Sequence, residues 1–176
     1  DAERELNMVN ILSITSFDGL LVSISSNSVI TSHFQELLDR GVPIVFFDRF
    51  PKAINATKVL QDDFLGAFQA TEHLIHRGYT KIAHIAGTEH LSFTQQRLKG
   101  SLAALEKHDL PVREEWIIFS GFSPQCGEND MARLLNLQDI PAAVFSVKDR
   151  NGVGAVIALQ RRGVTVVSRI GIAGGS

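Results

Sequence analysis

The sequence predicts a doubly wound α/β fold built around parallel β-sheet. Apolar runs of strand length alternate with stretches of helical period, which is the pattern of successive strand and helix units. The alternation recurs about every 30 residues, the length of one such unit rather than of a solenoid repeat. Glycines stand where several helical stretches stop, as helix C-termini favour. The predicted strands cover residues 19–24, 43–47, 58–60, 81–86, 116–119, 142–147 and 170–173.

The predicted helices fill the spaces between these strands. The first covers residues 2–11. The second carries apolar residues on one face from position 34 to position 38 and ends at Gly41. The third carries such a face from position 64 to position 75 and ends at Gly78. Both glycines are predicted to adopt the left-handed conformation that closes a helix.

Three further helices are predicted in the second half of the chain. Ser123 and Pro124 have the features of an N-cap and a first-turn proline, so a helix is expected to start there. Apolar stripes predict the other two helices. The first stripe consists of Leu98, Leu102 and Leu105. The second consists of Val153, Val156 and Ile157 and ends before Gly163.

Composition narrows the class of protein. The chain has 176 residues, of which 44% are hydrophobic and 20% charged, so it can bury a core and is predicted to be globular. A formal net charge of −2 gives no basic field for DNA or an anionic membrane. Cys126 stands alone, so no intrachain disulfide is expected, which favours the cytoplasm. Neither a membrane span nor a signal peptide is expected from the apolar runs.

The residues that follow the predicted strands form the candidate site. In open parallel sheets, ligands bind beyond the carboxyl ends of the strands, because loops and helix N-termini converge there. Carboxylates, cationic groups and phenyl rings follow the strands of this sequence, and this mixture suits a small polar molecule with an apolar ring face. The candidate residues are Asp48, Phe93, Arg97, Phe122, Lys148 and Asp149.

Three other kinds of chemistry are weakly represented. The histidines at positions 73, 76, 84 and 90 suggest a metal site, but neither a cysteine nor a carboxylate completes a plausible set, so no metal is expected. Gly152 and Gly154 resemble part of a dinucleotide fingerprint, yet the third glycine and the ribose-binding acid are missing. No Gly-x-Ser-x-Gly elbow is present, so no catalytic residue and no cofactor is expected.

Several stretches resemble one known family. Residues 73–87, HLIHRGYTKIAHIAG, resemble the helix, Gly-aromatic turn and strand signature of the lac repressor and galactose repressor (LacI/GalR) family of bacterial transcriptional regulators. Residues 97–100, RLKG, are similar to the Arg-x-x-Gly helix of that family. Residues 18–22, 42–49 and 141–145 extend the resemblance over the chain, in the order and spacing of the family.

The resemblance implies a fold and a function. It implies a periplasmic-binding-protein-like fold of two parallel-sheet sub-domains, residues 1–60 and 61–176, with the effector between them. The least regular stretch, residues 50–56, agrees with a crossing near residues 60–62. The family's first strand is expected upstream and its last crossing strands downstream.

By this resemblance the chain senses a sugar, a sugar derivative or a nucleoside. It would control operator DNA bound by an N-terminal helix-turn-helix outside these residues, in a cytoplasmic homodimer. The alternative is an exported periplasmic sugar-binding protein that serves a transporter. A third class, a hydrolase or nucleotide enzyme on a similar scaffold, would require turnover of a substrate, and none is expected.

The resemblance also suggests roles for the candidate residues. Asp48 matches the acid after the second strand, Arg97 the arginine that grips the effector, and Phe122 a ring-stacking position. Phe93 falls where a small or polar residue is frequent, so its bulk would narrow the pocket.

Two positions depart from the family pattern. The family's Asn-Asp pair is Lys148-Asp149 here, and the acid after the last glycine falls near Ser176. A cation in place of an amide favours an anionic group on the ligand, provided that Lys148 points into the site.

Overall fold

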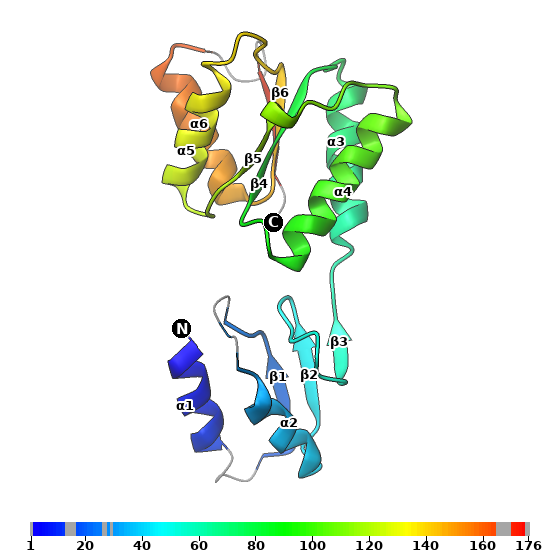
Figure 1. The fold of residues 1–176 in the computed structure, drawn as a ribbon, viewed down its shortest axis with the longest axis vertical. Helices are drawn as coiled ribbons and strands as arrows, with labels where there is room; N and C mark the ends of the chain where they lie inside the picture. Colours follow the sequence, from blue (N-terminus) through cyan, green and yellow to red (C-terminus); the bar gives the residue numbers. More distant parts are fainter. Residues whose placement is uncertain (1, 13–16, 26–27, 29, 165–169, 175–176) are drawn as a thin grey trace. The chain divides into compact units, whose positions relative to one another are not determined.

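The computed structural model describes residues 2–12, 17–25, 28, 30–164 and 170–174. The chain forms two compact units, Asp1–Gln61 (unit 1) and Asp62–Ser176 (unit 2) (Figure 1). Among the helices within these described ranges, none has the length and apolar character needed to cross a membrane.

Unit 1 is a small parallel sheet packed against helices. Its strands lie in the order β1-β2-β3, and both strand pairs are parallel. Phe34 and Phe46 meet edge to face in its core, with ring centroids 5.4 Å apart. Glu5 of the first helix accepts hydrogen bonds from the backbone of Ser25 and the hydroxyl of Ser28, which ties this helix to the loop after β1. The elements are α1 (Ala2–Leu12), β1 (Leu20–Val22), α2 (Ser32–Asp39), β2 (Ile44–Phe47) and β3 (Thr57–Val59).

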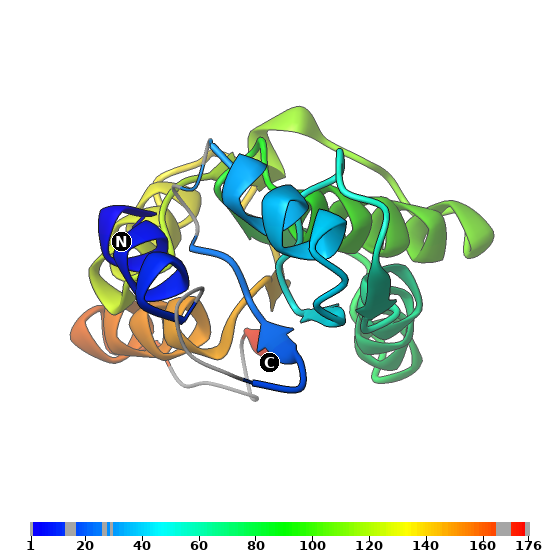
Figure 2. The ribbon, with the colours of Figure 1, turned by 90° about the horizontal axis from the view of Figure 1, so that it is seen from below.

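Unit 2 is a doubly wound parallel sheet, as the sequence predicts. Its strands lie in the order β5-β4-β6-β7, and every pair is parallel. Helices α3 and α4 cover one face and α5 and α6 the other (Figures 1 and 2). The elements are α3 (Asp63–His76), β4 (Ile82–Gly87), α4 (Ser92–Lys107), β5 (Ile117–Phe119), α5 (Pro124–Leu134), β6 (Ala143–Ser146), α6 (Asp149–Arg161) and β7 (Gly171–Gly174).

The two helical layers explain why the central strands are apolar throughout. All six residues of β4 are buried, because each face of the sheet is covered. Side chains that point to opposite faces of the sheet belong to two separate cores. Ile85 and Val144 pack toward α5 and α6, whereas Ile82 and Phe145 pack toward α3 and α4. The sheet of unit 2 therefore packs against its helices through one apolar core on each face.

Local signals at helix ends are confirmed. Gly41 and Gly78 have φ angles of +82° and +91°, and Gly163 has +66°. The Ser123 hydroxyl accepts a hydrogen bond from the backbone N–H of Cys126 at 3.2 Å, and Pro124 is the first residue of α5. The sequence therefore places these helix boundaries correctly.

The apolar stripe predicted for the last helix is wrong at one position. Val153 is 54% exposed. The buried side of α6 instead carries Gly154, Ala155, Ala158 and Leu159. Small residues lie where α5 and α6 approach each other backbone to backbone, because this approach excludes larger side chains.

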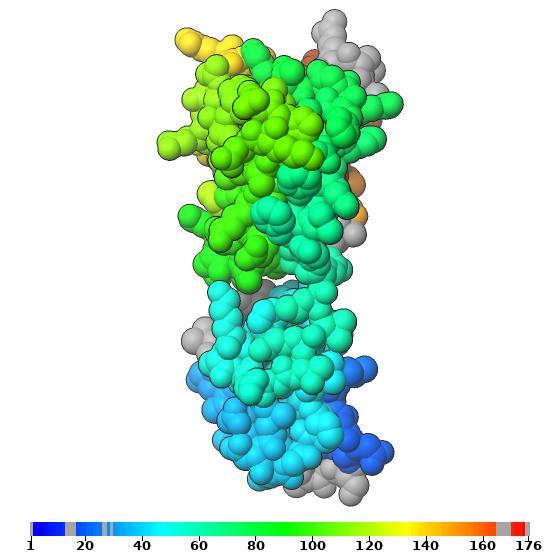
Figure 3. All heavy atoms as spheres, turned by 90° about the vertical axis from the view of Figure 1, so that its right-hand side faces the viewer, coloured from blue at the N-terminus to red at the C-terminus, as the bar shows by residue number. Residues whose placement is uncertain are grey.

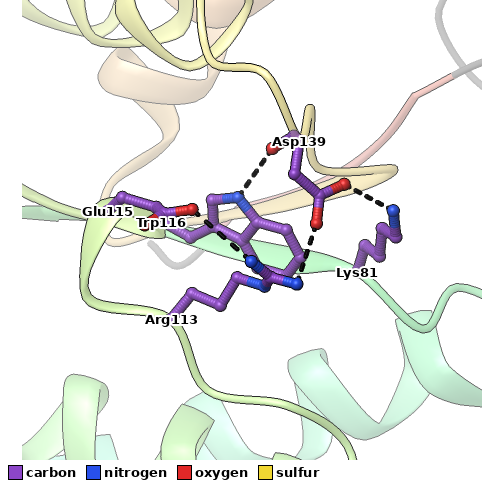
Figure 4. A network of polar contacts seen from close by, with 5 residues as sticks. All are labelled: Lys81, Arg113, Glu115, Trp116 and Asp139. Atoms are coloured by element: carbon purple, nitrogen blue, oxygen red, sulfur yellow. Dashed lines mark hydrogen bonds and ion pairs between the residues drawn. The ribbon is translucent and has the colours of Figure 1, made fainter.

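A network of polar contacts joins the starts of three strands of unit 2 (Figure 4). Trp116, just before β5, is 1% exposed, and its indole N–H donates to the carbonyl of Asp139 at 3.0 Å. The Asp139 carboxylate, upstream of β6, pairs with Lys81 at 2.5 Å and Arg113 at 3.1 Å. The hydrogen bond from Lys81 lowers the pKa of Asp139. These contacts brace the amino end of the sheet, opposite to the edge that carries the candidate site.

Candidate functional site

Five of the predicted site residues gather beyond the carboxyl ends of three neighbouring parallel strands in unit 2. Phe93 and Arg97 are on α4, which follows β4. Phe122 follows β5, and Lys148 and Asp149 follow β6. The sheet brings these three connections to one edge, because β4 lies between β5 and β6. We call these five residues the rim.

Phe93 is the centre of the rim. Its ring lies 5.5 Å from the ring of Phe122, centroid to centroid, with the planes tilted by 35°. The Nζ of Lys148 lies 5.0 Å from the Phe93 ring centroid, and the Cζ of Arg97 lies 5.7 Å from it. Two cations therefore lie against one phenyl ring, which holds all four side chains in one cluster through cation–π and ring contacts.

Gly87 creates the space that Phe122 occupies. It is the last residue of β4 and has a φ of +77°. A Cβ at this position would lie 2.2 Å from the Phe122 ring, closer than any real contact. Glycine is thus needed both for the backbone conformation and for the approach of the ring, which explains why the strand in the family-like signature ends in glycine.

Arg97 is held in place by the protein itself. The side chain is buried, with a residue exposure of 6%. Its Nε donates to the Asp63 carboxylate at 2.8 Å, and its Nη1 donates to the carbonyl of Val147 at 2.5 Å. These bonds link α4 to the first turn of α3 and to the end of β6. The guanidinium is thereby fixed at the edge of the sheet, beside Phe93.

Asp63 is a site residue that the sequence analysis missed. It stands 34 residues before Arg97, and the two meet because α3 and α4 pack together. Its neighbour Asp62 is the N-cap of α3 and accepts a hydrogen bond from the N–H of Leu65. Adjacent acids at a helix start are ordinarily interpreted as capping residues, so nothing in the local pattern marks Asp63 as the partner of an arginine.

Lys148 and Asp149 occupy the N-terminus of α6. Lys148 is half-buried, and its carbonyl accepts a hydrogen bond from the Ser146 hydroxyl at 2.9 Å. Asp149 is exposed, and its carboxylate lies near the end of β7, because a Cβ at Gly174 would lie 2.6 Å from Asp149 Oδ1. The rim therefore carries charges of both signs, with the carboxylate beside β7 and the cations beside Phe93.

Asp48 belongs to unit 1 and follows β2. It is exposed and has a φ of +58°, a left-handed conformation that aspartate tolerates better than most residues. The next residue, Arg49, donates from Nε to the carbonyl of Ile24 at 2.7 Å, which holds this turn against the end of β1. The family acid expected near Ser176 lies outside the described residues.

A buried histidine lies in the sheet near Arg97. His84, in the middle of β4, packs against Phe145 with ring centroids 4.9 Å apart. Neither ring nitrogen has a hydrogen-bond partner in the described part of the chain. Burial, and to a lesser extent the nearby Arg97 charge, lower the pKa of His84 to about 3. The imidazole is thus neutral at physiological pH.

Two features considered in the sequence take on different meanings in the structure. Gly152 and Gly154 lie inside α6 rather than in a loop before it, so they do not form a phosphate-binding turn. Among the histidines, His76 lies next to Glu72 and to His108, and these three form the one group of possible metal ligands found among the described residues. The sequence suggests His76 as a ligand, but nothing in the local pattern marks Glu72 or His108 as its neighbours.

Comparisons with known proteins agree with this architecture. Residues 1–174 match the family of periplasmic binding proteins and sugar-binding domains of the LacI family. The chain is 33% identical over 175 residues to the HTH-type transcriptional repressor PurR of Actinobacillus pleuropneumoniae serotype 5b. This alignment covers 99% of this chain and 51% of that protein. The chain spans about half the length of the curated relatives it matches.

Solved structures show the same fold. A regulatory protein of the LacI family from Chloroflexus aggregans superimposes with a TM-score of 0.81 at 28% identity, covering 99% of this chain and 61% of that one. The transcriptional regulator CelR in complex with cellobiose superimposes with a TM-score of 0.83 at 27% identity, covering 99% and 53% respectively.

Proposed function

Because this chain belongs to the family of periplasmic binding proteins and sugar-binding domains of the LacI family, we propose that it is the effector-sensing part of a bacterial transcriptional repressor. Its relatives include HTH-type transcriptional repressors, which supports this assignment. The observation that carries the proposal is the rim itself. Side chains from three separate strand–helix connections converge on one phenyl ring at the carboxyl edge of a parallel sheet.

The rim suits a small polar molecule that has a ring. Phe93 and Phe122 offer apolar faces, and Arg97, Lys148 and Asp149 offer charged hydrogen-bonding groups. A sugar, a sugar derivative or a nucleoside has this combination of an apolar face and polar edges. The relative CelR was solved in a complex with cellobiose, which supports a carbohydrate-like effector.

Lys148 narrows the effector class. Its ammonium lies against Phe93 within the rim, where the family pattern has an amide. An ammonium donates hydrogen bonds but cannot accept them, so it favours an anionic oxygen over a neutral hydroxyl. We propose that the effector carries a carboxylate or phosphate, as a sugar acid or a sugar phosphate does.

The regulatory part of the proposal follows from family membership. The effector must favour one conformational state over another by a few kcal/mol in order to change operator binding. The proposal further takes the protein to be a cytoplasmic homodimer that contacts operator DNA through helix-turn-helix segments, as the description of its relatives as HTH-type repressors suggests. It includes no catalytic step.

A ligand panel tests the effector class. The purified chain is heated with sugars, sugar phosphates, sugar acids and nucleosides, and a rise in Tm identifies a ligand. A ligand at about 100 times its Kd stabilises the folded chain by about 2.7 kcal/mol, which is readily measured. We expect the anionic compounds to give the largest rise.

Substituting Lys148 tests the role of its charge. We expect Lys148→Met to weaken binding of the anionic effector by about 10- to 100-fold, because a hydrogen bond to a charged group contributes about 1.5–3 kcal/mol. The methionine keeps an apolar chain against Phe93, so the fold of the rim should persist. The measurement is the Kd from calorimetric titration of both proteins with the compound found in the panel.

Lys99→Met is the matched control for this prediction. Lys99 is exposed on α4, outside the rim, and removing its charge changes the net charge equally. If both variants weakened binding to the same extent, the effect would be one of net charge and the role of Lys148 would be wrong.

The coding sequence upstream of Asp1 distinguishes a repressor from an exported binding protein. A helix-turn-helix followed by a short hinge helix would support the repressor. A basic start, an apolar core and a small-residue cleavage site would instead support export, and the DNA-binding part of the proposal would be withdrawn.

A further inference from the structure

We propose that unit 2 carries a second site, which binds a divalent transition-metal ion of the zinc type between α3 and the end of α4. Its ligands are Glu72, His76 and His108. One ligand atom from each of these side chains lies within 4.8 Å of the other two. This site is separate from the rim and does not depend on the function proposed for it.

The backbone brings the three ligands together. Glu72 and His76 are one helical turn apart on α3, so their side chains share one face of the helix. His108 follows directly after α4. The two helices lie very close together at Gly100 of α4. A Cβ there would lie 2.1 Å from the carbonyl oxygen of Phe64 in α3, so only glycine permits this approach. The position of His108 beside α3 is therefore set by the packing of the helices.

The distances between the donor atoms are close to those that a bound metal ion requires. The Nε2 of His108 lies 3.0 Å from Glu72 Oε1. The rings of His76 and His108 stand edge to face with centroids 5.6 Å apart. In a tetrahedral zinc site, bonds of about 2.0–2.2 Å place ligand atoms about 3.3 Å from one another. His76 is exposed, so its side chain is free to turn toward the other two ligands.

The chemistry of the set favours zinc over magnesium. Two imidazoles and one carboxylate are ligands that Zn²⁺ accepts, with water in the fourth position. Mg²⁺ prefers oxygen ligands in an octahedron and would be bound poorly by two nitrogens.

Lys107 competes for the same oxygen. Its Nζ lies 2.8 Å from Glu72 Oε1, the atom that also contacts His108. The Lys107 side chain is 58% exposed, so it can move into solvent when a cation binds. A metal ion would then replace the ammonium as the positive charge beside Glu72. Removing Lys107 should consequently strengthen metal binding.

The proposed ion would not block the rim. Arg97 and His108 are eleven positions apart, which corresponds to about 16 Å along α4. The side of unit 2 formed by α3 and α4 faces the viewer in Figure 3, where these helices form much of the surface. A bound ion would join the last turn of α3 to the end of α4 and should raise the Tm.

The test is a titration of the metal-free chain with Zn²⁺ alone, in a buffer that does not chelate metal. We expect saturable binding of one equivalent, measured by equilibrium dialysis, together with a rise in Tm. Mg²⁺ should produce neither. We expect His76→Ala and Glu72→Gln each to weaken Zn²⁺ binding by about tenfold or more, since each removes one ligand. Lys107→Met should strengthen it severalfold.

His73→Ala is the matched control, because His73 lies on the same helix, is exposed and is outside the cluster. It should leave Zn²⁺ affinity unchanged. The proposal is overturned if the wild-type chain shows no saturable binding, if His73→Ala weakens binding as much as His76→Ala, or if Lys107→Met fails to strengthen it. Unfolding curves recorded without metal establish that each variant is folded.

Discussion

The folded chain is expected to lose stability steeply as the pH falls from about 6.5 to 4.5, with His84 as a main cause. The side chain is 3% exposed and has no hydrogen-bond partner for either nitrogen in the described part of the chain. Its pKa in the folded state is about 3, because burial in the sheet disfavours the imidazolium. Protonating it in place would put an unpaired charge in the core beside Phe145.

The direction of the effect follows from proton binding. An unfolded histidine has a pKa of about 6.5, so between that value and about 3 the unfolded chain binds a proton that the folded chain rejects. The free energy of unfolding therefore falls by up to about 1.4 kcal/mol per pH unit in this range, or by roughly 2 kcal/mol from pH 6.5 to 4.5. Well above pH 6.5 this contribution is constant. Glu72, whose folded pKa is about 2, adds an acid loss only below its ordinary value of 4.5.

His84→Leu isolates this contribution. Leucine fills a similar volume without a titratable group, and replacing an unpaired buried polar group by an apolar one is close to neutral or stabilising. Urea unfolding of both proteins at several values between about pH 7.5 and 4.5 should show equal or higher stability for the variant at the upper end and a shallower fall. Subtracting the two curves removes the other titrating groups.

His90→Leu serves as the control, since His90 is exposed in the loop after β4. The free energy of unfolding of this variant should fall with decreasing pH as steeply as that of the wild type. A His84→Leu protein that retained the full slope would mean that His84 does not reside neutral in the core, and the burial of β4 would have to be revised.

Gly154→Ala is expected to destabilise the fold by about 3 kcal/mol, at the upper end of the range for overpacked cores. A Cβ at Gly154 would lie 1.9 Å from the carbonyl oxygen of Pro124 and 2.7 Å from the backbone nitrogen of Glu128. Both are backbone atoms of α5, so no side-chain rotation relieves the overlap. A Cβ at Gly127 of α5 would likewise lie 2.0 Å from the carbonyl oxygen of Asn151 in α6. The two helices must separate to admit even one methyl group.

Gly66→Ala provides the comparison for this prediction. Gly66 lies in α3, is exposed and has no atom within 4 Å of an added Cβ. Alanine there should stabilise the protein by about 0.5–1 kcal/mol, because it has the higher helix propensity. Chemical unfolding of both variants gives the two values. Equal stability of Gly154→Ala and the wild type would refute the backbone contact between α5 and α6.

The sequence by itself determined the order and type of the elements. The strand-length apolar runs became parallel strands, because both faces of the unit 2 sheet are covered and its strands are apolar throughout. Gly41 and Gly78 marked helix ends, and Ser123 marked a helix start, since each acts through atoms within a few residues along the chain. The rim residues could also be placed at one edge, because every strand of a parallel sheet ends on the same side.

What the side chains contact was decided only by the tertiary structure. Arg97 meets Asp63 across 34 residues, Lys148 meets Phe93, and His108 completes a cluster with Glu72 and His76. The buried face of α6 likewise carries small residues where α5 lies against its backbone. The spacing of apolar residues along the chain predicts which side of a helix is apolar, because that spacing involves only residues a few positions apart. Contacts between helices depend on how closely two backbones approach, and that distance is set by packing in three dimensions.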